Sequence, residues 1–146
     1  MCLMLYLATS DEQPLRRSPE ISVEEVEPSR DAVRQWFSLP IVRFIGSHTS
    51  CSCGFPSVVA AEPVEYFVGM FDDDEDREAD LTSVDSLLVI IRGHVAATGE
   101  VELYPVWDGE ESNPPKGVLT VDLVSLNRET FFLKQHFLYR VTADAK

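Results

Sequence analysis

The segment from 83 to 97 constrains the fold more than any other, because a helix formed there would be apolar on nearly every side. Five large apolar residues recur at helical spacing: Val84, Leu87, Leu88, Ile91 and Val95. Val89 and Ile90 extend the apolar surface around the helix. We expect this helix to begin at a capping box formed by Thr82 and Asp85 and to end before Gly99. A helix this apolar has to be covered, so we expect it to pack across the main sheet.

The remaining segments favour strands. Apolar, alternating or β-branched residues predict strands over 2–8, 21–26, 41–46, 101–107, 118–124 and 131–141. The last of these also fits helical spacing, but its aromatic and β-branched content favours the strand. A short helix is expected after Pro28 and ends before Pro40. The order predicts a single α+β domain over 1–146, with a mainly antiparallel sheet and one long and one short helix packed on a face.

The densest charge run lies at 72–80 and is predicted to be a solvated acidic loop or linker. Its alternating aspartates imitate the opening of a calcium loop. However, Arg77 stands where that loop requires glycine, and Ser83 stands where it requires glutamate. The run therefore does not predict a calcium site.

The formal net charge of −13 excludes two classes of partner. Binding to nucleic acid or to an anionic membrane surface needs clustered lysine and arginine. An acidic surface instead attracts a basic protein, so a non-catalytic binding or regulatory module is one expected function. The opening residues lack the basic region of a secretory signal, and the cysteine count of three is odd. We therefore expect reduced thiols and a cytoplasmic protein.

The run from Gly46 to Phe55 gathers the side chains best suited to chemistry. It contains His48, Cys51 and Cys53, and it follows directly on the strand predicted at 41–46. If the first strand pairs with that strand, Cys2 adds a third thiol. Three sulfurs and one imidazole nitrogen suit tetrahedral zinc, although only one residue separates the two thiols of the loop. The sequence thus predicts a thiol-centred site built from these four residues.

Two other thiol chemistries stay open. Cys51 and Cys53 are close enough in sequence to form a strained, readily reduced disulfide, which would make the site a redox centre. Met1-Cys2 running into a strand resembles the opening of N-terminal-nucleophile amidotransferases. That resemblance implies Cys2 as the nucleophile with its own α-amine as base, although no glutamine pocket is recognisable. Of the other histidines, His94 is predicted to be a hydrogen-bonded structural residue, and His136 is predicted to be exposed on the last strand.

Overall fold

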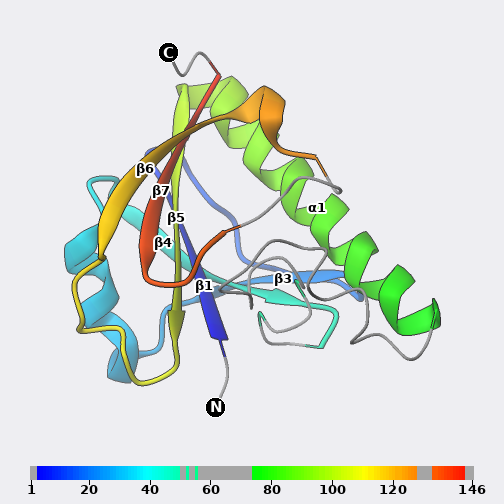
Figure 1. Ribbon diagram of the computed structural model, residues 1–146, viewed down its shortest axis with the longest axis horizontal. Coiled ribbons are helices and arrows are strands. Elements are labelled where there is room, and N and C mark those ends of the chain that lie inside the picture. Colours follow the sequence, from blue (N-terminus) through cyan, green and yellow to red (C-terminus); the bar gives the residue numbers. More distant parts are fainter. Residues whose placement is uncertain (1–2, 50–51, 53–54, 56–73, 128–132, 144–146) are drawn as a thin grey trace.

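A computed structural model describes residues 3–49, 52, 55, 74–127 and 133–143, with side chains of the long helix described from 78 onward. One seven-stranded sheet forms the centre of the molecule (Figure 1), in the order β2-β3-β4-β1-β5-β7-β6. The strands are β1 (Leu3–Thr9), β2 (Arg16–Arg17), β3 (Ile21–Glu25), β4 (Ile41–Ser47), β5 (Glu100–Trp107), β6 (Gly117–Asp122) and β7 (Phe137–Thr142). All pairings are antiparallel except β6–β7, which is parallel. The predicted α+β fold with a mainly antiparallel sheet is confirmed.

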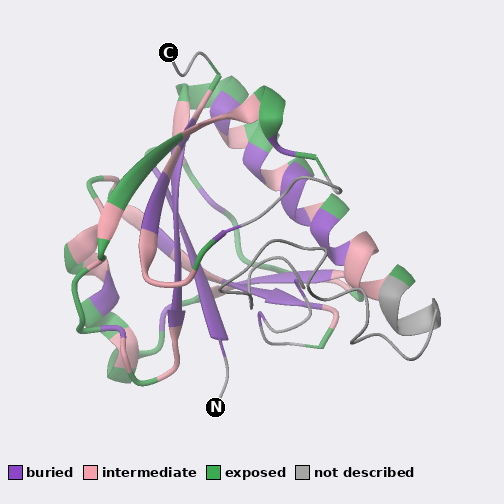
Figure 2. Ribbon diagram, viewed as in Figure 1, coloured by how far each residue is buried: buried purple, intermediate pink, exposed green. Residues whose placement is uncertain are grey.

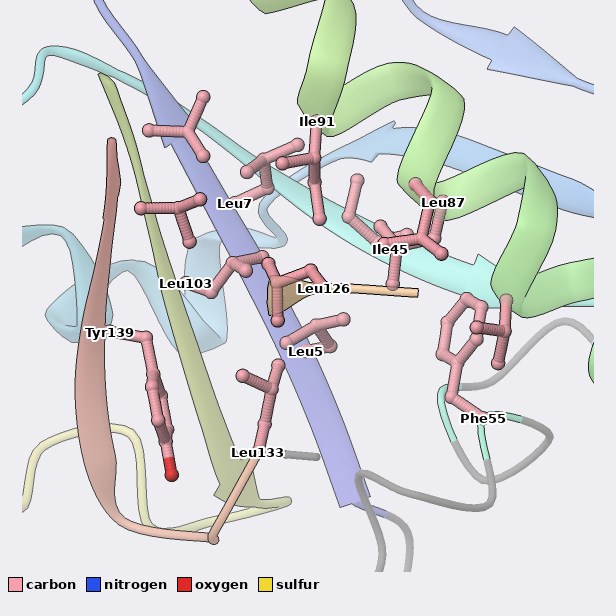
Figure 3. Packing of buried hydrophobic residues seen from close by; sticks show 14 of the residues in the cluster. Leu5, Leu7, Ile45, Phe55, Leu87, Ile91, Leu103, Leu126, Leu133 and Tyr139 are labelled. Atoms are coloured by element: carbon pink, nitrogen blue, oxygen red, sulfur yellow. The ribbon is translucent and has the colours of Figure 1, made fainter. Parts of the chain in front are cut away.

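The long helix α1 (Asp74–Thr98) packs across one face of this sheet. Odd-numbered residues of β1 point to this face because successive side chains of a strand alternate. Figure 3 shows Leu87 and Ile91 of α1 directed toward Leu7 and Ile45 of the sheet. The five residues at helical spacing that predicted the helix are all buried in this core. The prediction that the apolar helix packs across the main sheet is therefore confirmed.

The helix starts earlier than its sequence signals predict. Because α1 begins at Asp74, residues 74–80 of the acidic run are helical rather than a loop, and the predicted capping box is wrong. Thr82 lies within the helix, where its hydroxyl donates to the carbonyl of Glu78. Acidic residues are favourable in the first turns of a helix because they oppose the positive end of its dipole. The charge run thus extends the helix, and a cap is not needed at 82.

Residues 78–98 of α1 are also long and apolar enough to cross a membrane by length and composition alone, with a mean hydropathy of 1.2. The packing on the sheet accounts for much of this composition, because the buried face of the helix belongs to the core. The opposite face is partly apolar too, since Val89 remains 64% exposed. Of this apolar window, 33% is buried in the structure.

The second helical segment covers the other face of the sheet. It is a 3-10 helix, η1 (Pro28–Trp36), and its Val33 is fully buried. Trp36 and Phe37 pack beside it on a cluster that includes Tyr6 and Tyr104. The two helical segments therefore cover opposite faces, rather than one face as the sequence analysis expected (Figure 1). Each face of the central strands is consequently buried, which explains why β1 is buried at every position.

The last predicted strand, 131–141, is confirmed over β7, whereas residues 133–136 are not strand and 131–132 lie outside the described residues. Phe137, Tyr139 and Val141 share the α1 face, as the period of two predicted. His136 precedes β7 in a turn with a φ of 69°, and its side chain is only 14% exposed. Its Nε2 lies 3.7 Å from a carboxylate oxygen of Glu110. The prediction of an exposed His136 on the strand is therefore wrong.

Candidate functional site

The end of β4 lies beside the beginning of β1. These strands pair antiparallel with Leu5 opposite Ile45, so the pairing on which the predicted thiol site depends is present. Within the predicted site, His48 is described, whereas Cys2, Cys51 and Cys53 lie outside the described residues. Among the side chains that the structure does describe, no three histidine, cysteine or carboxylate residues gather as a metal centre.

Ser52 anchors the cysteine-rich run to both strands. Its buried hydroxyl accepts a hydrogen bond from the Leu5 amide at 2.7 Å and donates one to the Ile45 carbonyl at 2.7 Å. Phe55, three residues later, is fully buried in the α1-face core, and its amide donates to the Ser52 carbonyl. Ser52 is therefore fixed between β1 and β4, and Phe55 is fixed in the core under α1.

This anchor gives a stability prediction. Replacing Ser52 with alanine leaves the Leu5 amide and the Ile45 carbonyl without their buried partner, so we expect unfolding to become easier by about 1–3 kcal/mol. Urea unfolding followed by circular dichroism measures the change. Ser29→Ala, at an exposed position of η1, serves as the control and should leave stability nearly unchanged. An equal midpoint for both variants would show that the Ser52 hydroxyl is not a structural anchor.

His48 is held by the first half of α1. Its Nε2 lies 2.6 Å from Oδ1 of Asp80, and both side chains are mostly buried, with exposed fractions of 23% and 13%. The His48 amide donates to the hydroxyl of Ser83, which in turn donates to the carbonyl of Glu20. Sequence reasoning found His48 but missed Asp80 and Ser83, because it placed one in a linker and the other at a helix start.

The Asp80 contact determines which atom of His48 is available for chemistry. With Nε2 bonded to a carboxylate, the imidazole is oriented through that nitrogen, and in the described part of the chain Nδ1 has no hydrogen-bond partner. A histidine that ligates a metal usually binds through one nitrogen while a carboxylate or carbonyl fixes the other. The same arrangement also stabilises an imidazolium beside a thiolate. The pair therefore suits both metal binding and thiol activation.

His94 lies near the other end of α1 and is a useful comparison. Its Nδ1 lies 2.8 Å from Oδ1 of Asp11, so the prediction of a hydrogen-bonded histidine is confirmed. The pair joins α1 to the loop that follows β1. The sequence places no cysteine within ten residues of His94, and Cys2 precedes β1 in the sequence whereas Asp11 follows it. This second histidine–aspartate pair therefore acts as a tie between elements.

A cleft of about 710 Å³ opens on the η1 face, and sequence reasoning missed it. Tyr6 and Phe44 contribute aromatic side chains to its lining, and Arg30 of η1 contributes a cation. Arg30 pairs with Asp108 at 2.9 Å and with Glu27, while Tyr6 donates to Glu111 at 2.9 Å. Burial lowers the pKa of Arg30, but the carboxylates of Asp108 and Glu27 outweigh burial and hold it above its ordinary value.

The lining of this cleft is balanced in charge. Three arginines and three glutamates contribute to it: Arg16, Arg17, Arg30, Glu24, Glu25 and Glu27. The best-buried of these groups, Arg30, is already satisfied by neighbouring carboxylates. The cleft thus offers no net charge with which to select a ligand.

Comparison with known proteins gives no further guide to the site. No protein-family model, curated protein or solved structure is detectably similar to this chain.

Proposed function

We propose that the end of β4 carries a thiol-centred metal site, with zinc bound by Cys2, His48, Cys51 and Cys53. The observation that carries the proposal is the 2.6 Å contact between His48 and Asp80. A carboxylate in this position fixes the ring and its tautomer, which is the usual environment of a histidine that binds zinc. A set of three thiolates and one imidazole is one of the common combinations at structural zinc sites.

The anchoring of Ser52 supports the same proposal. Ser52 lies between Cys51 and Cys53 in the sequence, and its partner Leu5 follows Cys2 by three residues. The hydrogen bond between Ser52 and Leu5 thus joins the two segments that carry the thiols. His48 lies four residues before Ser52 and directly after β4. The proposal requires reduced thiols, in keeping with the cytoplasmic location that we also propose.

Metal analysis tests the proposal. The protein is purified without chelator, and its zinc content is measured by mass spectrometry together with the thiols that react before and after unfolding. We expect one zinc per chain and thiols that react only after the metal is removed. Asp80→Asn, which keeps the shape of the side chain, is expected to weaken zinc affinity roughly 10- to 100-fold.

His94→Gln is the matched control, because His94 is also held by an aspartate, Asp11 of the loop after β1, but has no place in the proposed site. It should retain full zinc content, whereas His48→Gln should lose zinc. Metal-free protein with three freely reacting thiols would overturn the proposal. Metal-free protein with a bond between Cys51 and Cys53 would replace it with the redox alternative.

Binding of a basic protein through the acidic surface remains a prediction from the net charge of −13. No feature of the cleft favours it, because the lining is balanced in charge. Such binding would weaken steeply as salt is added, since exposed charges are screened.

A further inference from the structure

The two edges of the sheet differ in how well they are protected. At one edge, β2 has only two residues, Arg16 and Arg17, and both are exposed. Short, charged edge strands resist pairing with another chain. At the other edge, β6 is six residues long, and its first five residues, Gly117 to Val121, carry no charge and no proline. The β6 edge therefore lacks the protection that the β2 edge has.

Residues 118–120 of β6 are exposed as well as uncharged. Val118 is 54% exposed and Leu119 is 43% exposed, and Val124 in the following 3-10 turn, η4 (Leu123–Ser125), is 83% exposed. Figure 2 shows this exposed stretch along β6. Exposed, uncharged edge strands rich in β-branched residues are the segments that pair with other strands.

The backbone of β6 has one hydrogen-bonding side turned outward. The Pro105 carbonyl of β5 accepts a hydrogen bond from the His136 amide, so the odd-numbered residues of β5 direct their backbone groups toward β7. The odd-numbered residues of β7 lie opposite them and face β5, so in the parallel pairing with β7 the odd-numbered residues of β6 direct their backbone groups toward β7. Consequently Val118 and Thr120 direct theirs away from the sheet. In the sheet order of the described strands, no strand lies beyond β6 to receive them.

We propose that β6 pairs antiparallel with β6 of a second copy of this chain, which joins the two sheets into one. Leu119 would lie opposite the partner's Leu119, and Gly117 opposite the partner's Val121. In this register Val118 lies opposite the partner's Thr120, and the backbone groups of both point outward, as the hydrogen-bonded pairs of an antiparallel ladder require. Leu119 then occupies the non-hydrogen-bonded position between two such pairs. The occupant of the edge is thus another molecule of the same protein.

Charge complementarity selects this register. In it, Lys116 lies opposite the partner's Asp122, and symmetry repeats the pair at the other end of the strand. Cross-strand pairs share one face of the sheet, and Lys116 and Asp122 are both even-numbered, so their side chains lie on the same face. Parallel pairing in register would instead place lysine against lysine and aspartate against aspartate.

Reversing these charges one at a time tests the proposal. Lys116→Asp and Asp122→Lys each place two like-charged pairs in the interface, so we expect each variant alone to dimerise roughly 10- to 100-fold more weakly than the wild type. An equimolar mixture of the two variants restores opposite charges at both ends. We therefore expect the mixture to form a heterodimer about as tightly as the wild-type homodimer.

Sedimentation equilibrium over a range of protein concentrations measures these affinities. Asp122 also accepts a hydrogen bond from the Val124 amide, and Asp122→Lys removes this bond both alone and in the mixture. Dimerisation that is restored in the mixture therefore shows that the charges, and not a folding defect, weakened the single variants. Arg16→Asp makes the same charge change as Lys116→Asp at the opposite edge and should leave dimerisation unchanged. A wild type that stays monomeric, or charge reversals without effect on its dimerisation, would overturn the proposal.

Discussion

Replacing Glu102 with alanine is expected to lower the free energy of unfolding by about 2–4 kcal/mol, because it removes a buried carboxylate that accepts three hydrogen bonds. The Glu102 side chain is fully buried on β5 and points to the η1 face. Its Oε1 accepts hydrogen bonds from the amides of Ser38 and Leu39, each at 2.9 Å, and from the Ser38 hydroxyl at 3.0 Å. Its Oε2 lies 3.5 Å from Nη2 of Arg140.

These contacts connect the end of η1 to the centre of the sheet. Without Glu102, the amides of the turn between η1 and β4 lose their acceptor, and Arg140 loses its only ion pair among the described residues. Glu102→Gln keeps an oxygen that can accept from the turn, so we expect it to destabilise the protein less than the alanine variant does. The order of stability should be wild type, then glutamine, then alanine.

Urea unfolding at neutral pH provides the measurement. Glu24→Ala is the matched control, because it removes the same charge from an exposed ion pair with Arg17, and exposed pairs contribute at most about 1 kcal/mol. If Glu102→Ala unfolds at the same urea concentration as Glu24→Ala, the network around Glu102 does not hold η1 on the sheet.

Glu102 also shows where sequence reasoning reaches its limit. The strand at 101–107 was predictable from its apolar and β-branched residues, and it is present as β5. A glutamate within such a strand indicates a solvent-facing position only if that face of the sheet is open. Here η1 covers the face. A 3-10 helix with one fully buried residue has too weak a hydrophobic pattern in its sequence to predict which face of the sheet it covers.

The cysteines and the histidine of the candidate site were predictable from the sequence, whereas the carboxylate that holds the histidine was not. Cysteine and histidine are scarce, so their clustering after a predicted strand was visible in the sequence. The partner of His48 was not, because Asp80 is 32 residues away and lies among several acidic residues that are alike in sequence. Only the position of α1 across the sheet selects Asp80. Periodicity therefore predicted the core of the fold, whereas contacts between distant polar residues required the structure.

Stability is expected to fall steeply as the pH rises above about 10, where an exposed tyrosine ordinarily ionises. Burial, together with the charge of Glu110, raises the pKa of Tyr104 to about 12. Burial also raises the pKa of Tyr139 and, with the negative charge and hydrogen bond of Glu111, that of Tyr6. All three side chains are buried, and Tyr6 and Tyr104 are fully so.

The sign follows from proton binding. Above the ordinary tyrosine pKa, the unfolded chain releases phenolic protons that the folded chain retains. Each further rise in pH therefore lowers the free energy of unfolding. The stabilisation is complete below pH 10 and is lost as the pH rises toward the raised values. Tyr104 alone accounts for about 2 kcal/mol by the time the pH reaches its folded pKa.

Urea unfolding at a series of alkaline pH values measures this loss, and ultraviolet absorbance follows tyrosinate formation in parallel. Tyr104→Phe should reduce the fall in the free energy of unfolding with pH by the contribution of Tyr104, because phenylalanine has no phenolic proton to release. The variant also loses the hydrogen bond from the Tyr104 hydroxyl to the Asn113 carbonyl, which lowers stability equally at every pH below the transition. A change in slope, rather than in the neutral-pH value, therefore identifies the ionisation. A wild-type profile that stays level while all tyrosines ionise near their ordinary pKa would contradict the prediction, because it would mean that folding does not hold these phenols in their neutral form.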